Sequence, residues 1–196
     1  MGASERNDAK RRIWHQLVTL RSADRFVFLD ESGANLTLAR RYGRAPHNER
    51  CPGTAPRNYP TNLTLLAACT LDGIGPSLVL NGAVNGPIFH AYIERVLVPT
   101  LRAGQIVVMD NLNVHKHASI RAAIRQAGCY LVYLPSYSPD FNPIELAFSK
   151  IKAHLRRVGV RTQEALEAAI GEAIDLITPD DALGYFRHCG FTMPGQ

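Results

Sequence analysis

The chain has 196 residues, of which 46% are hydrophobic, and its formal net charge is +5 at pH 7. This length and composition allow one sizeable buried core and exclude a low-complexity or disordered protein. No apolar run approaches the roughly 18 residues of a membrane span, and the polar start has no signal-peptide core.

The four cysteines lie far apart, at Cys51, Cys69, Cys129 and Cys189, and no two of them form a CxxC pair. The spacing therefore indicates neither a zinc ribbon nor a disulfide framework, and we expect a protein of the reducing cytoplasm. The positive charge favours a polyanionic partner, although many proteins without such a partner are equally basic.

The first predicted element is an amphipathic helix at about residues 8–22. Its apolar face carries Ile13, Trp14, Leu17 and Leu20. We interpret residues 1–24 as a linker or packing helix and residues 25–196 as one domain.

A strand is predicted next at residues 26–29, where aromatic and β-branched residues lead into Asp30. Residues 32–60 are rich in glycine, proline and arginine. Their composition fits a solvated loop as well as a loop that clamps a strand or contacts phosphate.

The remaining elements follow from periodicity and turn residues. In chain order they are strands at 62–71 and 76–80, a helix at 87–101, a strand at 106–109, a helix at 117–127, a strand at 130–134, and helices at 143–157, 163–177 and 179–188. Several strands followed by alternating strands and helices predict an α/β fold with a mixed sheet.

Three carboxylates stand at the ends of these predicted elements. Asp30 and Asp110 each follow a short run typical of a central parallel strand, and Glu145 lies in the first turn of a helix. Such strands carry function at their carboxyl ends. Clustered carboxylates suit Mg²⁺ or Mn²⁺, and two such ions can clamp both oxygens of a phosphoryl transfer. The pattern therefore predicts a metal-dependent enzyme that acts on phosphodiesters.

Other acidic residues could serve as ligands, and Glu145 has a possible structural role as well. Glu31 adjoins Asp30, but neighbouring strand residues point to opposite faces, and we favour Asp30. Asp140 fits a turn better than a metal site. With Asn142 as N-cap and Pro143 at the first helical position, Glu145 falls where a capping-box glutamate belongs, a role compatible with metal binding.

The helix after Glu145 predicts a row of basic side chains. Lys152 and Arg156 share a helical stripe with Glu145, about 90° around from the apolar stripe. A basic row that leads away from a carboxylate site is well placed to bind DNA phosphates, although such side chains are commonly only solvated.

Three segments together resemble the catalytic domain of mariner-like bacterial insertion-sequence transposases, which belong to the DDE superfamily of endonucleases. They are Phe28-Leu-Asp-Glu-Ser-Gly33, Val108-Met-Asp-Asn-Leu-Asn-Val-His-Lys116 and Tyr133-Leu-Pro-Ser-Tyr-Ser-Pro-Asp-Phe-Asn-Pro-Ile-Glu145. In addition, 34 residues separate Asp110 from Glu145, which is a spacing common in that family.

The resemblance implies an RNase H-like fold with a mixed five-stranded sheet flanked by helices. It implies that Asp30, Asp110 and Glu145 bind two Mg²⁺ ions, with Mn²⁺ as a substitute, and catalyse DNA strand cleavage and strand transfer. Asn111 and His115 would line the site, unless they serve only as turn or cap residues, and Lys116 would touch DNA. The implied partners are the DNA of the element ends and of the target, and a second copy in an active homodimer.

Two features depart from the family pattern. Ser136 stands where many relatives have a second proline, which we expect the loop to tolerate. About 20 residues before the first strand cannot hold the helix-turn-helix modules that recognise element ends. We therefore expect a catalytic half, either completed by a separately encoded helix-turn-helix portion or left as a truncated remnant.

Two alternative functions remain open. The first is a catalytically silent, DNA-binding or regulatory remnant of a transposase. The second is a phosphatase with an aspartate nucleophile at Asp30, which is disfavoured because Ser32 stands where such enzymes usually have another aspartate.

Overall fold

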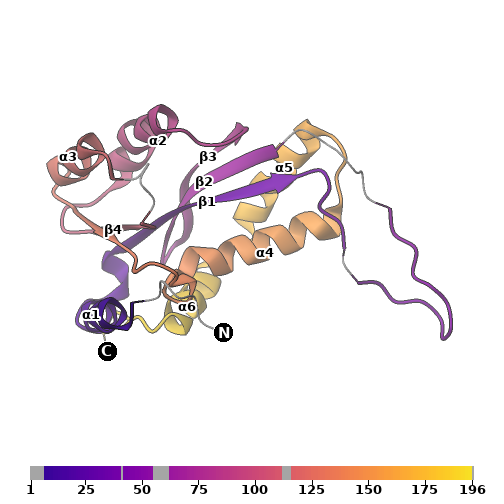
Figure 1. Cartoon of the computed structure of the whole chain (residues 1–196), viewed down its shortest axis with the longest axis horizontal. Helices are drawn as coiled ribbons and strands as arrows, with labels where there is room; N and C mark the ends of the chain where they lie inside the picture. The colour runs from indigo at the N-terminus through magenta and orange to yellow at the C-terminus, as the bar shows by residue number, and fades with distance from the viewer. Residues whose placement is uncertain (1–6, 41, 55–61, 112–115, 196) are drawn as a thin grey trace.

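A five-stranded mixed sheet in the order β3-β2-β1-β4-β5 forms the centre of the molecule (Figure 1). The computed structural model describes residues 7–40, 42–54, 62–111 and 116–195. The strands are β1 (Phe26–Asn35), β2 (Asn62–Thr70), β3 (Gly73–Asn81), β4 (Ile106–Met109) and β5 (Tyr130–Tyr133). β1, β2 and β3 pair antiparallel, whereas β4 runs parallel to both β1 and β5.

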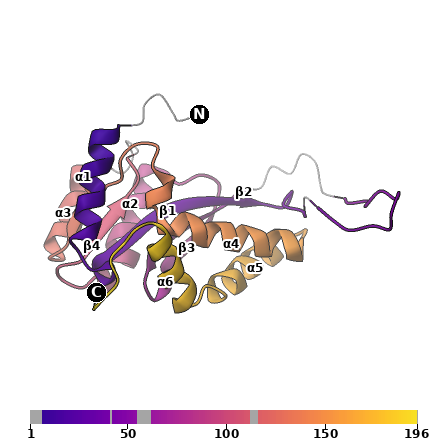
Figure 2. The same ribbon diagram turned by 90° about the horizontal axis from the view of Figure 1, so that it is seen from below.

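Alternate residues of β1 enter two separate cores, because successive side chains of a strand point to opposite faces. Phe26 and Phe28 pack on the face covered by α4, α5 and α6, and Val27 and Leu29 pack on the face covered by α2 and α3 (Figure 2). These helices are α2 (Gly86–Tyr92), α3 (Ala118–Gln126), α4 (Pro143–Val158), α5 (Gln163–Asp175) and α6 (Pro179–His188). The sheet is thus the middle of three layers.

β1 is longer than the sequence predicts. The expected strand ends at Leu29, and its parallel pairing with β4 does stop there, at Leu29 and Met109. On its other side β1 stays paired with β2 as far as Asn35 and Asn62, and this antiparallel ladder keeps the chain extended. Asp30 therefore lies within β1, at the point where its parallel neighbour ends.

The helix expected at 87–101 is only partly α-helical. It begins as α2 behind the Asn85 cap, continues as a π-helical turn, η2 (Ile93–Leu97), and ends as a 3₁₀ turn, η3 (Val98–Thr100). Pro99 lies in that last turn, and proline cannot donate the backbone hydrogen bond that would continue an α-helix.

The amino-terminal helix α1 (Asp8–Thr19) is an integral part of the core. Trp14 and Val18 are buried together with residues of α4 and α6, whereas Ile13 and Leu20, expected on the same face, are 66% and 74% exposed. The buried face is instead shared by Trp14, Val18 and the polar side chain of Arg11.

Residues 39–40 and 42–54 lie on a long projection beside the carboxyl end of α4 (Figure 1). None of the helices in the described ranges is long and apolar enough to cross a membrane.

Candidate active site

The strand register places Asp30 and Asp110 side by side. Leu29 pairs with Met109 in the parallel β1–β4 ladder, so the next residue of each chain segment follows at the same level. Phe28 and Val108 both lie in the core beneath α4. Alternation then directs the two aspartates, two positions further on, to that same face of the sheet.

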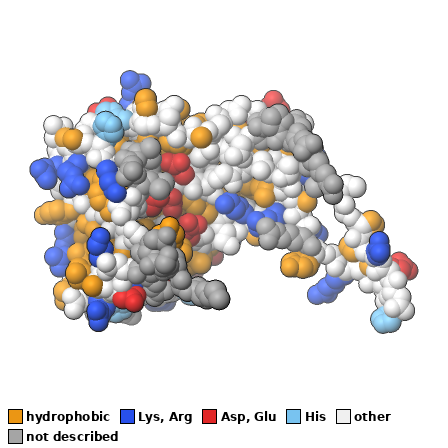
Figure 3. Space-filling view, viewed as in Figure 1, with side chains coloured by type: hydrophobic (Ala, Val, Ile, Leu, Met, Phe, Trp, Pro, Cys, Tyr) orange, Lys and Arg blue, Asp and Glu red, His pale blue; other side chains and the backbone are white. Residues whose placement is uncertain are grey.

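Glu145 approaches the two aspartates from the first turn of α4. Its neighbour Ile144 is fully buried in the core beneath that helix, whereas Glu145 itself is exposed. The three carboxylates line one pocket of about 410 Å³, whose wall is completed by residues 134–139. Acidic side chains gather at the centre of this face, where β1 and β4 meet the start of α4 (Figure 3).

The two alternative carboxylates lie elsewhere. Glu31 follows Val27 and Leu29 in the alternation of β1, which assigns it to the opposite face, and it does not line the pocket. Asp140 is engaged by the guanidinium of Arg11. The pocket therefore contains Asp30, Asp110 and Glu145 without either alternative.

Asp30 is the most strongly perturbed of the three carboxyls. Its pKa is raised to about 6, first because burial disfavours the charged form and then because Glu145 and Asp110 add negative charge. Two donors oppose this rise: the Glu31 backbone N–H donates to Asp30 Oδ1 at 2.8 Å, and Asn142 Nδ2 donates to Asp30 Oδ2 at 2.8 Å. A nearby cation would favour the ionised carboxylate.

Asn142 is the site residue that the sequence analysis missed. The predicted capping box is wrong here, because the Asn142 side chain makes no cap hydrogen bond and turns instead to Asp30. Its Oδ1 is buried and accepts no hydrogen bond from the residues that the structure describes. A capping box does form at α6, between Thr178 and Asp181.

The secondary site residues have different positions. Asn111 lines the pocket, and its Nδ2 donates to Ser136 Oγ at 3.4 Å. Lys116 is exposed just before α3. His115 lies outside the described residues.

A basic row runs along α4 away from the pocket, as the periodicity predicts. Lys152 and Arg156 are half-buried, and in the described part of the chain their side chains have no hydrogen-bond or ion-pair partner. Lysine and arginine side chains gather over α4 beside the acidic centre (Figure 3). The row ends at a hollow of about 560 Å³ whose lining includes Arg40, Arg44, Arg156, Arg157 and Arg161.

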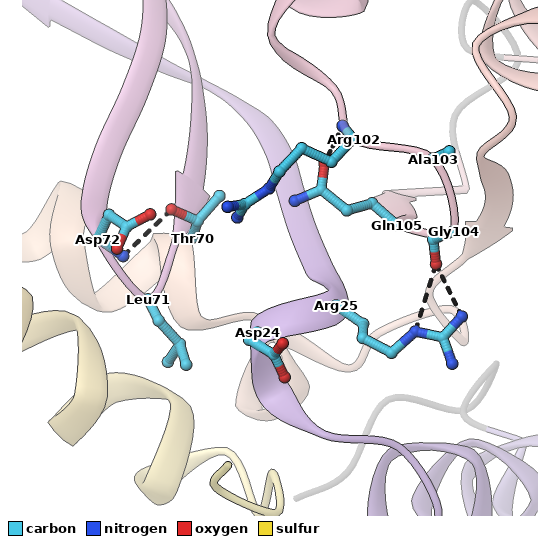
Figure 4. Close-up of a pocket in the computed structure, with 9 residues that line it drawn as sticks. All are labelled: Asp24, Arg25, Thr70, Leu71, Asp72, Arg102, Ala103, Gly104 and Gln105. Atoms are coloured by element: carbon cyan, nitrogen blue, oxygen red, sulfur yellow. Dashed lines mark hydrogen bonds between the residues drawn. The ribbon is translucent and has the colours of Figure 1, made fainter.

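A larger cavity, of about 650 Å³, lies at the opposite end of the central strands (Figure 4). Arg25, immediately before β1, donates to the Gly104 carbonyl at 2.8 Å, and Arg102 and Gln105 come from the turn before β4. Asp24 and Asp72 also line this cavity. The lining of this cavity shares no residue with the carboxylate pocket. Functional groups of parallel strands gather at the carboxyl ends of the strands, whereas this cavity lies at their amino ends, so the carboxylate pocket is the candidate site.

Comparison with solved structures identifies the fold. The chain matches a pre-cleavage Mos1 transpososome with a TM-score of 0.74 at 14% identity, over 95% of this chain and 59% of that chain. It matches a Mos1 mariner paired end complex with Mn with a TM-score of 0.73 at 17% identity, over 95% and 59%. It matches the Mos1 transposase catalytic domain with Raltegravir and Mg with a TM-score of 0.66 at 14% identity, over 92% and 88%.

The fold is therefore RNase H-like, which confirms the implication of the sequence resemblance. The chain spans about 59% of the length of the first two Mos1 chains.

Comparison with curated protein sequences finds no match. A family model described as DDE superfamily endonuclease matches residues 25–167, which is most of the chain and includes all three pocket carboxylates. The chain belongs to the DDE superfamily of endonucleases.

Proposed function

We propose that this chain is the catalytic domain of a transposase, and that it cleaves DNA strands and transfers them in a reaction that requires a divalent metal. The observation that carries the proposal is the pocket shared by Asp30, Asp110 and Glu145, which come from β1, the end of β4 and the start of α4. Membership of the DDE superfamily and the likeness to Mos1 support it.

The donor set fits a hard divalent cation. Carboxylate oxygens are the ligands that Mg²⁺ and Mn²⁺ prefer, and Asp30, Asp110 and Glu145 would hold two such ions. In their present positions, no three acidic, histidine or cysteine side chains of the described residues are arranged so that they could hold a metal ion. Glu145 is exposed, so rotation of its side chain is free to bring the carboxylate towards the two aspartates. When bound, the ions polarise the phosphodiester and stabilise negative charge on the attacking and leaving oxygens.

The other residues orient ligands and substrate. Asn142 donates to one oxygen of Asp30, and the Glu31 backbone N–H donates to the other. Together the two hydrogen bonds orient the carboxylate. Asn111 and His115 are proposed to line the substrate side of the pocket. Lys116, Lys152 and Arg156 are proposed to bind phosphates, so that the scissile phosphate lies at the carboxylates while the flanking backbone follows α4.

The proposed partners are the DNA of element ends and target, a second copy of the chain in the active assembly, and a separately encoded helix-turn-helix portion for end recognition. A cytoplasmic location is part of the same proposal, and four free cysteines are consistent with it.

The test combines metal binding with DNA nicking. Titration calorimetry should show Mn²⁺ binding to the wild-type chain, and Asp110→Asn should weaken that binding at least tenfold. The wild type should nick supercoiled plasmid only with Mg²⁺ or Mn²⁺, whereas Asp110→Asn should not. Asp72→Asn, which removes an exposed carboxylate in the β2–β3 turn, is the matched control and should behave as wild type.

Each unfavourable outcome has a distinct meaning. Mn²⁺ binding that Asp110→Asn leaves unchanged would contradict the metal site. Asp110-dependent Mn²⁺ binding without nicking, also when the chain is combined with a helix-turn-helix portion, would favour the catalytically silent remnant.

A further inference from the structure

One arginine of α1 reaches across to the chain segment that forms the pocket wall. Arg11 Nη1 donates to Ser138 Oγ at 2.6 Å and to Asp140 Oδ1 at 3.0 Å, and its Nη2 donates to Asp140 Oδ2. The guanidinium also lies over the ring of Phe141, 4.2 Å from its centroid. A single side chain, 9% exposed, thus contacts three of four consecutive residues.

The segment held by Arg11 joins β5 to α4 and lies outside the sheet. After Leu134, whose N–H donates to the Met109 carbonyl, its backbone bonds are local turns that include the 3₁₀ turn η5 (Pro139–Phe141). Tyr137 has a φ of 54°, in the left-handed region that is unfavourable for a residue with a side chain. Contacts from outside the segment are therefore needed to fix it, and α1 supplies them through Arg11 and through Trp14, which packs on Phe141.

The end of this segment determines the carboxylate site. Asn142 follows Phe141 directly and donates to Asp30, and the Asn142 carbonyl accepts the Glu145 N–H at 3.2 Å in the first turn of α4. A shift of residues 138–141 would move both Asn142 and the start of α4 relative to β1. The placement of Glu145 opposite the two aspartates thus depends on a helix at the other end of the sequence.

We propose that Arg11 is a positioning residue for the metal site, which it serves by bracing residues 138–141 and thereby setting Asn142 and Glu145 against Asp30. This inference rests on the proposed function. The guanidinium is suited to this task because its planar fork donates to both oxygens of Asp140 while it stacks on Phe141, a combination that the point charge of lysine cannot reproduce. Asn142 is an outer partner of the proposed ligand Asp30, and such partners commonly influence metal affinity by 10- to 100-fold, so a displaced Asn142 should be measurable in Mn²⁺ affinity.

The test uses Arg11→Lys and Asp140→Asn, with Lys150→Met as the matched control. Lys150 on α4 pairs with Asp181 on α6 at 2.6 Å and does not line the pocket. Lys150→Met therefore removes an ion pair of α4, the helix that carries Glu145, without touching residues 138–141. Mn²⁺ affinity of the full chain is measured by calorimetry, and nicking is measured as a function of Mn²⁺ concentration.

We expect Arg11→Lys and Asp140→Asn each to weaken Mn²⁺ binding about tenfold, with nicking regained at high Mn²⁺. The double variant should be little worse than Arg11→Lys alone, since the Arg11–Asp140 pair that Asp140→Asn disturbs is already lost in that variant. Lys150→Met should lower the melting temperature and leave Mn²⁺ affinity unchanged. Hydrogen exchange of the Phe141 and Asn142 amides should accelerate in the Arg11 and Asp140 variants alone.

Wild-type Mn²⁺ affinity and wild-type exchange in a folded Arg11→Lys protein would overturn the inference. If Arg11→Lys does not fold, Asp140→Asn decides, because the Asp140 side chain is 55% exposed and asparagine has nearly the same shape. A wild-type chain whose Mn²⁺ binding does not depend on Asp110 would instead refute the proposed function, and the exchange measurement would still report whether Arg11 braces the segment.

Discussion

The side chain of Asn142 bonds the carboxylate of Asp30 and does not cap α4, which its sequence context does not reveal. An asparagine before Pro143 at a helix start predicts an N-cap, and the backbone does take that place in α4. Asn142 Nδ2, however, donates to the carboxylate of Asp30, and because a hydrogen bond to an ionised group is worth more than a neutral one, this bond orients the side chain and leaves its oxygen without a backbone N–H of the described residues to accept from. Since sequence analysis considers local spacing only, it cannot see an acceptor that lies 112 residues away.

Glu145→Gln separates metal binding from stability. Glu145 is exposed and no side-chain cap is present at α4, so the substitution should change the free energy of unfolding by less than about 1 kcal/mol. Metal-dependent strand cleavage should nevertheless fall to near background, because an amide is a poor ligand for Mg²⁺. Urea denaturation and plasmid nicking measure the two quantities. Cleavage at the wild-type rate would show that Glu145 is not a ligand.

The raised pKa of Asp30 predicts a pH dependence of stability in metal-free buffer. Its folded pKa of about 6 exceeds the ordinary value of 3.8, so the folded state holds the proton more tightly. The stability from this group is therefore fully present below pH 4 and is lost as pH rises through 6, by at most on the order of 3 kcal/mol. Asp30→Asn removes this loss.

Urea denaturation with EDTA at pH 4.5 and 7.5 tests the sign. Asp30→Asn should gain stability relative to wild type at pH 7.5 and gain much less at pH 4.5. Asp72→Asn, at an exposed turn position, provides the control for a general loss of one acidic group. An equal effect of Asp30→Asn at both pH values would contradict the raised pKa.

At the scale of elements, patterns of burial predict the sheet well and the amino-terminal helix poorly. The strands that bear the aspartates are short apolar runs, and the order of strands and helices is sufficient to indicate a mixed α/β sheet. α1 misleads because its buried face includes Arg11, a charged residue whose burial depends on Asp140, Ser138 and Phe141 in a distant segment. Hydrophobic periodicity has no means of detecting such a partner, and it selects Ile13 and Leu20 instead.

For the candidate site too, features set by the local sequence are predictable and features set by distant partners are not. Asp30 and Asp110 are predictable because strand ends and alternation are local properties of the sequence. The π-helical turn η2 and the continuation of β1 to Asn35 are not, because both depend on packing and pairing with remote residues.

On the scale of the whole molecule, charge is divided between neighbouring regions of one face. The acidic pocket lies at the start of α4, and Arg156 lies 11 residues along the same helix, roughly 16 Å away. That separation is close to the rise of about five base pairs of duplex DNA. One helix can therefore bring the scissile phosphate to the carboxylates while it holds the flanking backbone.

Charge reversal at Lys152 and Arg156 should weaken DNA binding uniformly across sequences. In EDTA, fluorescence anisotropy with labelled duplexes should give an affinity that falls steeply with salt, and the double glutamate variant should lower the slope by about 2. Arg125→Glu is the control for charge, because Arg125 is exposed on α3, which covers the opposite face of the sheet. Tight, salt-insensitive recognition of one sequence would refute the prediction that the chain binds DNA through phosphate contacts.

The pairing of β1 with β4 joins residues about 80 positions apart, for example Phe28 with Val108. Contacts between residues so far apart slow the folding of a domain, because the loop has to be closed before the pairing stabilises it. β1, β2 and β3 are neighbours in sequence and can form a meander early, but this meander contains only Asp30 of the two aspartates. The two aspartates can therefore meet only once β4 has joined β1, so a partly folded chain that lacks this pairing has no assembled carboxylate pocket.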